Sequence, residues 1–283
     1  MTSRLRTWAK RVIPEKYRLA RYEWNEALRY YPELVLSLGT RFECPFCGWH
    51  FRRLRSAGFE YPVLTEKQVV GGSWHLDDVC PRCMANARER LVYFYLKQNT
   101  PVFKERLRLL HIAPEPHLER VLRQLPQILY ITGDLAARSV DVRVDIMFLP
   151  FPDESFDLII CNHVLEHVFD DRVGMSELRR VLRTDRPALL QVPIARAIEE
   201  TVEDPTASTD ADRIRLFGQR DHVRLYAAGD YIERLERAGF CVQLSNAKDC
   251  LGEGTVRRYA LIREEPVFCC RSTPRHMPRG EPS

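Results

Sequence analysis

The stretch of sequence that decides the fold is SFDLIICNHVLEHV, residues 155–168. Its apolar run at 156–161 is short and dense, which is typical of a buried strand. Further strand-like runs lie on both sides of it, at 107–112, 128–132, 188–192, 241–244 and 258–262. Helical stretches lie between several of them, at 117–125, 172–183 and 230–238. A strand followed by a helix, repeated, predicts an α/β fold with a doubly wound, mostly parallel sheet covered by helices on both faces.

The ends of the predicted strands indicate where a ligand binds. In a doubly wound sheet the ligand lies beyond the carboxyl ends of the strands. The first strand runs into Ala113 and Glu115, and the second ends at Asp134. A carboxylate at the second position suits the two hydroxyls of a ribose and hence a cofactor that contains adenosine. An Asp at a strand end also caps turns and helices just as often, so both interpretations stand.

Two cysteine pairs predict a metal site before this domain begins. Residues 44–48 read CPFCG and residues 80–83 read CPRC. Two residues between thiolates allow one tight turn to present both sulfurs to a tetrahedral ion, and Gly48 lets the backbone bend around it. We therefore expect a structural zinc site with the ligands Cys44, Cys47, Cys80 and Cys83. Iron in a rubredoxin-like site and a redox pair are the alternatives.

The tract from Asp145 through VLEHV at 164–168 to Leu182 resembles the core of class I S-adenosylmethionine-dependent methyltransferases of the type 11 kind. With the two cysteine pairs, it resembles a bacterial subgroup that carries a zinc-knuckle module, over roughly residues 42–264. The resemblance implies a seven-stranded Rossmann-like sheet with a small zinc-ribbon-like module in front of it. It also implies methyltransferase activity with S-adenosylmethionine as the cofactor.

The resemblance also implies roles for single residues in cofactor binding. Asp134 matches the residue that holds the ribose hydroxyls, Asp145 the one that meets the adenine amino group, and Ile146 lies against the adenine ring. Asn162 and His163 match positions along the methionine half of the cofactor.

The loop after the first strand departs from the family pattern. The glycine-rich loop of the family is absent, and Ala113, Glu115 and His117 stand where its glycines would be. Two outcomes are open: either Glu115 becomes the carboxylate partner of the cofactor's ammonium group, or the loop binds the cofactor weakly or not at all.

For the chemistry itself, we expect His222 to act as the base or binder on the substrate side, with Asp221 adjusting it and His163 nearby. A neutral imidazole suits the removal of a hydroxyl proton near pH 7. The alternative is that Asp221 caps a helix and His222 packs in the interior. The expected acceptor is a hydroxyl or similar group of a small molecule or saccharide. An RNA methyltransferase and a non-catalytic binding protein are the alternatives, and the near-neutral body of the chain argues against RNA.

The chain divides into four predicted regions. Residues 1–41 form a basic amphipathic helical segment, 42–98 the cysteine module with its connecting helix, 99–264 the methyltransferase domain and 265–283 a disordered tail. The formal net charge is +4 over 283 residues, and residues 1–30 alone carry eight basic against three acidic side chains. That segment suits docking on a membrane surface or a protein partner, or packing on the chain's own body. With no transmembrane run and no secretory signal, we expect a cytoplasmic protein, with peripheral docking at the inner membrane surface as an option.

Overall fold

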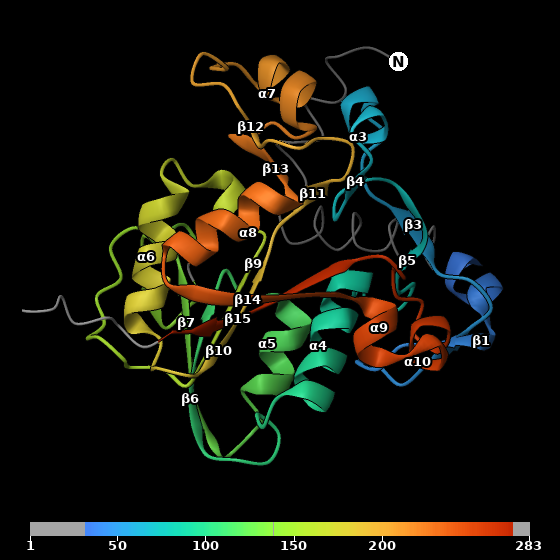
Figure 1. The fold of residues 1–283 in the computed structure, drawn as a ribbon. Helices are drawn as coiled ribbons and strands as arrows, with labels where there is room; N and C mark the ends of the chain where they lie inside the picture. The colour runs from blue at the N-terminus through green and yellow to red at the C-terminus, as the bar shows by residue number, and fades with distance from the viewer. Residues whose placement is uncertain (1–31, 138, 274–283) are drawn as a thin grey trace, which may run out of the picture.

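The computed structural model describes residues 32–137 and 139–273. Its main feature is a seven-stranded sheet of order β14-β15-β10-β9-β6-β7-β8 (Figure 1). The four pairs from β10 to β8 are parallel, and β15 is antiparallel to both of its neighbours. The strands are β6 (Leu107–Ile112), β7 (Ile128–Asp134), β8 (Val142–Arg143), β9 (Leu158–Asn162), β10 (Pro187–Gln191), β14 (Phe240–Asn246) and β15 (Pro266–Ser272). The predicted fold class, a doubly wound and mostly parallel sheet, is confirmed.

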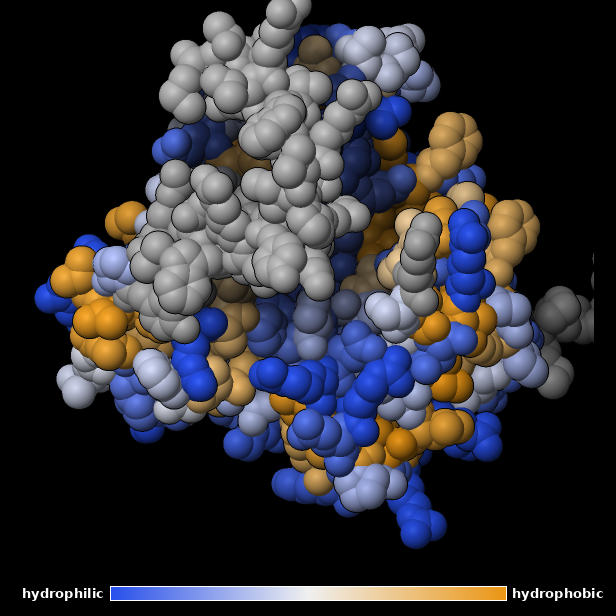
Figure 2. All heavy atoms as spheres, turned by 180° about the vertical axis from the view of Figure 1, so that it is seen from behind, coloured by the Kyte–Doolittle hydropathy of each residue, from blue (hydrophilic) through white to orange (hydrophobic). Residues whose placement is uncertain are grey.

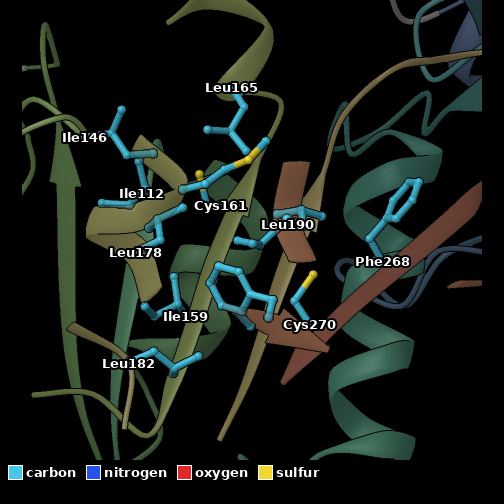
Figure 3. Close-up of a cluster of buried hydrophobic side chains, with 14 of the residues drawn as sticks. Ile112, Ile146, Ile159, Cys161, Leu165, Leu178, Leu182, Leu190, Phe268 and Cys270 are labelled. Atoms are coloured by element: carbon cyan, nitrogen blue, oxygen red, sulfur yellow. The ribbon is translucent and has the colours of Figure 1, made fainter. Parts of the chain in front are cut away.

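The central strand β9 shows why the sheet is buried on both faces. Ile159 and Cys161 belong to one hydrophobic core, which also contains side chains from α6 (Asp171–Val181) and α8 (Ala228–Arg237), as Figure 3 shows in part. Leu158 and Ile160 point to the other core, which is closed by α4 (Ala87–Asn99), α5 (Pro116–Leu122) and α9 (Ala247–Leu251). Side chains alternate between the faces of a strand, so a continuous apolar run fills both cores.

The carboxyl-terminal part of the chain corrects two expectations. The predicted strand at 258–262 is wrong, because α10 (Glu253–Arg258) ends there and a turn follows. The tail predicted from residue 265 onward is also wrong for its first part, since β15 is buried between β10 and β14. Pro266 stands at the first position of β15, where a residue without a backbone N–H is tolerated. Residues 274–283 lie outside the described part of the chain.

We call residues 38–86 the cysteine module. It contains two hairpins, β1 (Leu38–Glu43) with β2 (His50–Phe51) and β3 (Arg55–Ala57) with β5 (His75–Val79), and the short helix α3 (Pro62–Glu66). Its strand β4 (Val69–Val70) pairs with β11 (Ile194–Ala195), which comes directly after β10 of the main sheet along the chain. β13 (Arg224–Ala227) and β12 (Val202–Glu203) complete this second sheet, beside α7 (Asp210–Phe217). The cysteine module is thus tied into the body through β-pairing.

Most of the predicted basic amphipathic helical segment, residues 1–31 of 1–41, lies outside the described residues. Of its described end, residues 32–37 are helical and residues 38–41 belong to β1. Within the described part of the chain, no helix has the length and apolar character that crossing a membrane requires. Figure 2 shows hydrophilic and hydrophobic residues side by side over the visible back face.

Candidate active site

A cavity of about 290 Å³ opens at the carboxyl ends of β6 and β7, where the sequence predicts a ligand. We call it the strand-end cavity. Its lining is mostly apolar and includes Ile112, Ala113, Asp134, Asp145, Ile146, Met147, His163, His167, Val168 and Phe169. Five of the seven predicted cofactor residues therefore line one cavity.

The two aspartates of this cavity are held by short turns. Oδ1 of Asp134 accepts hydrogen bonds from the backbone N–H groups of Ala136 and Ala137, both at 2.7 Å. Oδ1 of Asp145 accepts one from Met147 at 2.9 Å. Each carboxylate is thus oriented through one oxygen, and the second oxygen makes no hydrogen bond to the described residues.

The loop after β6 keeps a glycine-like shape without glycines. Ala113 has φ +48°, in the left-handed region, and its N–H donates to the Gly133 carbonyl at 2.8 Å. Glu115 is held at both oxygens: Oε2 lies 2.7 Å from His111 Nε2, and Oε1 accepts from the Asn162 amide at 3.0 Å. Burial raises the pKa of Glu115, but the bonds from His111 and Asn162 outweigh it and hold the pKa below its usual range. Glu115 and Asn162 line a small separate cavity beside the strand-end cavity.

A second cavity, of about 340 Å³, lies between the main sheet and the cysteine module. We call it the module cavity. Residues 57–59, 71–79 and 86–88 form one wall, and segments 163–167 and 219–222 form the other. Its lining includes the polar side chains of His75, Asp78, Arg88, Glu166, Gln219 and His222. His163 and His167 line both cavities, so they stand at the junction.

His163 is oriented at this junction by a buried carboxylate. Its Nδ1 lies 3.2 Å from Oε1 of Glu166, which is 1% exposed. Burial and the nearby charge of Arg88 lower the pKa of His163, so the ring is neutral near pH 7. A carboxylate can only accept, so Nδ1 carries the proton and Nε2 keeps a free lone pair.

The predicted pair of Asp221 and His222 is arranged differently from the expectation. His222 is buried, and burial lowers its pKa to about 4. Asp221 is exposed, and its contacts are with His167: its carbonyl accepts from Nδ1 at 3.0 Å, and its carboxylate Oδ2 lies 3.7 Å from the same atom. The His167 and His222 rings meet edge to face with centroids 4.7 Å apart.

The four predicted cysteines form one cluster. The Sγ atoms of Cys44 and Cys83 are 3.6 Å apart, those of Cys47 and Cys80 are 3.8 Å apart, and all four lie within 4.8 Å of one another. Zn–S bonds of about 2.3 Å in a tetrahedron place sulfurs roughly 3.8 Å apart. The arrangement therefore fits a tetrahedral ion with no open position.

Both cysteine turns have the same backbone shape. The N–H of Gly48 donates to the Cys44 carbonyl at 2.9 Å, and that of Met84 to the Cys80 carbonyl at 3.0 Å. Gly48 and Met84 have φ values of +69° and +67°. The predicted role of Gly48 is thus matched by its geometry, and Met84 takes the same conformation without glycine.

Two residues that the sequence did not single out for this role fasten the cysteine module to the sheet. Arg90 is fully buried and donates to the carbonyls of Asp78, Ala85, Tyr259 and Ala260. His117 lies where the family has a glycine, and its Nε2 donates to the Cys83 carbonyl at 2.6 Å. The position of Arg90 in a helix offered no signal, because its partners are backbone atoms from distant segments.

Comparison with known proteins identifies part of the chain. Residues 117–186 match the family described as "Methyltransferase domain". Over 76 residues the chain is 36% identical to the uncharacterized methyltransferase YcgJ of Bacillus subtilis (strain 168), which covers 27% of this chain and 28% of YcgJ. The crystal structure of YcgJ is similar with a TM-score of 0.43 and 14% identity, over 67% of this chain and 100% of that one.

An S-adenosylmethionine-dependent methyltransferase from Mesorhizobium loti gives a TM-score of 0.44 at 14% identity, over 64% of this chain and 97% of that one. The family match and the seven-stranded sheet around it agree with each other. Residues 117–186 therefore match a methyltransferase domain, and they lie within the seven-stranded sheet and its helices.

Proposed function

We propose that this protein transfers a methyl group from S-adenosylmethionine to a hydroxyl or similar group of a small molecule or saccharide. The observation that carries the proposal is the junction of the two cavities at His163 and His167. One cavity is suited to the cofactor and the other to the acceptor, and the two meet where a methyl group would pass.

The residues of the strand-end cavity fit the cofactor. Asp134 offers a fixed carboxylate with one free oxygen for the ribose hydroxyls, and Asp145 offers the same for the adenine amino group. Ile146 and Met147 supply apolar contacts to the ring. On the methionine side, His163 and the Oδ1 atom of Asn162 remain available, because Oδ1 has no partner among the described residues, whereas Glu115 is engaged with His111 and with the Asn162 amide N–H. To bind the ammonium group of the cofactor, Glu115 would have to do so in addition to its bonds with His111 and Asn162, or give up one of them.

When bound, S-adenosylmethionine supplies a sulfonium-activated methyl group. The chain must align the acceptor with it, exclude water and take up a proton. His163 and His222 both lie beside the module cavity as neutral imidazoles, but burial lowers the pKa of His222 to about 4, which makes it a weak proton acceptor near pH 7. His163 has the more suitable tautomer, because Glu166 leaves its Nε2 lone pair free. Asp221 acts in this scheme by orienting His167.

We also propose that Cys44, Cys47, Cys80 and Cys83 hold a structural zinc ion. Their closed set of thiolates leaves no position for a substrate. The ion would fix the turn that carries the Cys83 carbonyl, to which His117 donates. Zinc would thereby support one wall of the module cavity without contacting the acceptor.

The test is calorimetry with S-adenosylmethionine and S-adenosylhomocysteine on the full chain, followed by a methylation screen of hydroxyl compounds and saccharides. Asp134→Asn keeps the turn but removes the charge, and the loss of charged hydrogen bonds weakens binding by roughly 10- to 100-fold. Asp210→Asn, in the exposed first turn of α7, is the matched control and retains wild-type affinity. A folded protein that binds neither compound would overturn the proposal.

A further inference from the structure

We propose that Glu166, His167 and His222 form a second metal site, for a divalent first-row transition ion, in the wall of the module cavity. One ligand atom from each residue lies within 4.8 Å of the other two. Zn²⁺ bonds of about 2.1 Å place ligand atoms some 3–4 Å apart, a contraction that side-chain rotation can supply. All three residues line the module cavity, so an ion held there would face its contents.

Two buried polar atoms in this cluster have no partner. Glu166 and His222 are 1% and 3% exposed, and neither Glu166 Oε2 nor His222 Nδ1 has a hydrogen bond within the described part of the chain. A buried carboxylate oxygen or ring nitrogen without a partner is costly, and native proteins rarely leave one so. A cation bound between them would satisfy both atoms at once.

The third ligand, His167, is already set in the tautomer that metal binding requires. A backbone carbonyl only accepts, so in the neutral form of the ring the 3.0 Å contact with the Asp221 carbonyl places the proton on Nδ1. The lone pair on Nε2 is then free, and this atom lies 4.0 Å from Glu166 Oε1. A ligating histidine that donates its other N–H to a carbonyl is the usual arrangement around bound metals.

The backbone under the cluster is firmly held. Glu166 and His167 belong to the 3-10 turn η1 (Leu165–His167). The buried Arg224 donates to the carbonyls of Leu165 and Val168 at 2.7 and 2.5 Å, and the N–H of Val223 donates to the Glu166 carbonyl at 2.9 Å. Val223 follows His222 directly, so the same bond fixes the spacing between the turn and the third ligand. Rigid support of this kind is what a metal site needs.

The ligand chemistry separates this site from the cysteine cluster. Two imidazoles and a carboxylate suit Zn²⁺, Fe²⁺, Mn²⁺ or Co²⁺ and leave coordination positions open, whereas four thiolates form a closed set. The open positions face the module cavity, where the acceptor is proposed to bind. The placement of the acceptor beside the ion rests on the proposed function. In this arrangement His222 is a metal ligand, and His163 is the residue that accepts the proton.

An acceptor hydroxyl beside a divalent cation loses its proton more readily. The proton passes to Nε2 of His163. The acceptor oxygen then forms the O–CH₃ bond with a lone pair while the S–CH₃ bond of S-adenosylmethionine breaks, and the electron pair of that bond stays on sulfur as a neutral thioether. Charge and atoms balance, and no oxidant or reductant is needed.

Metal titration of the full chain tests the site apart from any activity. With Zn²⁺ as the probe, elemental analysis after removal of excess ion should show two equivalents per chain. Co²⁺ loaded into the second site should give weak d–d absorption without added thiolate charge-transfer bands. Glu166→Gln and His222→Ala should each weaken the second equivalent on the order of 100-fold. His75→Ala is the matched control, because His75 lines the same cavity outside the cluster.

A wild-type chain that binds only the cysteine-held equivalent, or folded variants that keep the second one, would overturn the proposal. If His222→Ala fails to fold, the half-exposed His167 allows the same test with His167→Ala. The two proposals fail separately. A second equivalent without any methylation leaves the metal site standing, while cofactor binding and methylation without that equivalent leave only the proposed function.

Discussion

The two cavities that meet at His163 and His167 are built in different ways. The strand-end cavity is formed by the main sheet and the segments that directly follow its strands, and its lining is mostly apolar. The module cavity takes one wall from the cysteine module and the other from η1 and residues 219–222, and its lining is more polar than that of the strand-end cavity. Under the proposed function, the fold itself supplies the cofactor side, while an added module shapes the acceptor side. Specificity then resides in the added part.

The largest expected effect comes from removing a ligand of the proposed zinc ion, which would support only one of the two cavities. Cys80→Ser takes a fully buried sulfur from the cluster. Structural zinc contributes on the order of 10 kcal/mol in small zinc domains. We therefore expect the module to lose its fold and methylation to be lost, while S-adenosylhomocysteine affinity falls far less. Hydrogen exchange of residues 38–86, measured beside calorimetry, checks this.

Cys241→Ser is the control for that variant, because Cys241 is exposed and outside the cluster. It should leave exchange and affinity unchanged. An equal loss of hydrogen-exchange protection in the main sheet and in the cysteine module would show that the stability of the strand-end cavity also depends on the cysteine cluster.

A smaller effect concerns the small cavity that Glu115 and Asn162 also line, where Glu265 is buried and Arg88 forms part of the wall. Burial raises the pKa of Glu265 from 4.5 to about 7, and its Oε2 has no partner among the described residues. In the unfolded chain the carboxyl ionises near its ordinary pKa. The stabilisation from the neutral form is thus complete below pH 4.5 and is lost as the pH rises through about 7. The loss amounts to about 3 kcal/mol.

Glu265→Gln cannot titrate, so its free energy of unfolding should lack this decline. Urea unfolding of both proteins at pH 4.5, 6 and 8 gives the comparison, and their difference should grow with pH in favour of the variant. Parallel curves would show that Glu265 is ionised in the folded protein and has found a partner. Glu264→Gln, at the exposed neighbouring position, should follow the wild type.

The sequence predicted the grouping of residues around the strand-end cavity better than the grouping around the module cavity, for a physical reason. Asp134 is the last residue of β7 and Ala113 directly follows β6, and the ends of parallel strands meet at one edge. His222 comes close to Glu166 and His167 only because the chain turns back toward η1 after β12 and α7. No local sequence pattern predicts that path. In the same way, the spacing of the cysteines predicted the cluster. The position of the cysteine module as a wall of the module cavity depends instead on the contacts of Arg90 and on the pairing of β4 with β11.

The strand β15 was missed for a related reason. Its apolar core is short and lies between polar segments, so a local pattern does not distinguish it from a tail. Only the antiparallel register with β14 and β10 makes it a strand. Periodicity alone also failed at 258–262, where a short apolar run after a helix is compatible with either structure.

The smallest expected effect tests the loop on the cofactor side that lacks the family's glycines. Ala113 has φ +48°, a conformation that costs an L-residue roughly 1–2 kcal/mol. Ala113→Gly removes this strain but adds freedom to the unfolded chain worth about 0.4–1 kcal/mol. Stability should therefore rise by about 1 kcal/mol or less, and cofactor affinity should not fall, because the loop already has the glycine-like shape. Thermal unfolding and calorimetry measure the two quantities. A marked loss of affinity would mean that the methyl group of Ala113 itself contacts the cofactor, and the cofactor side would then depart from the family in more than its sequence.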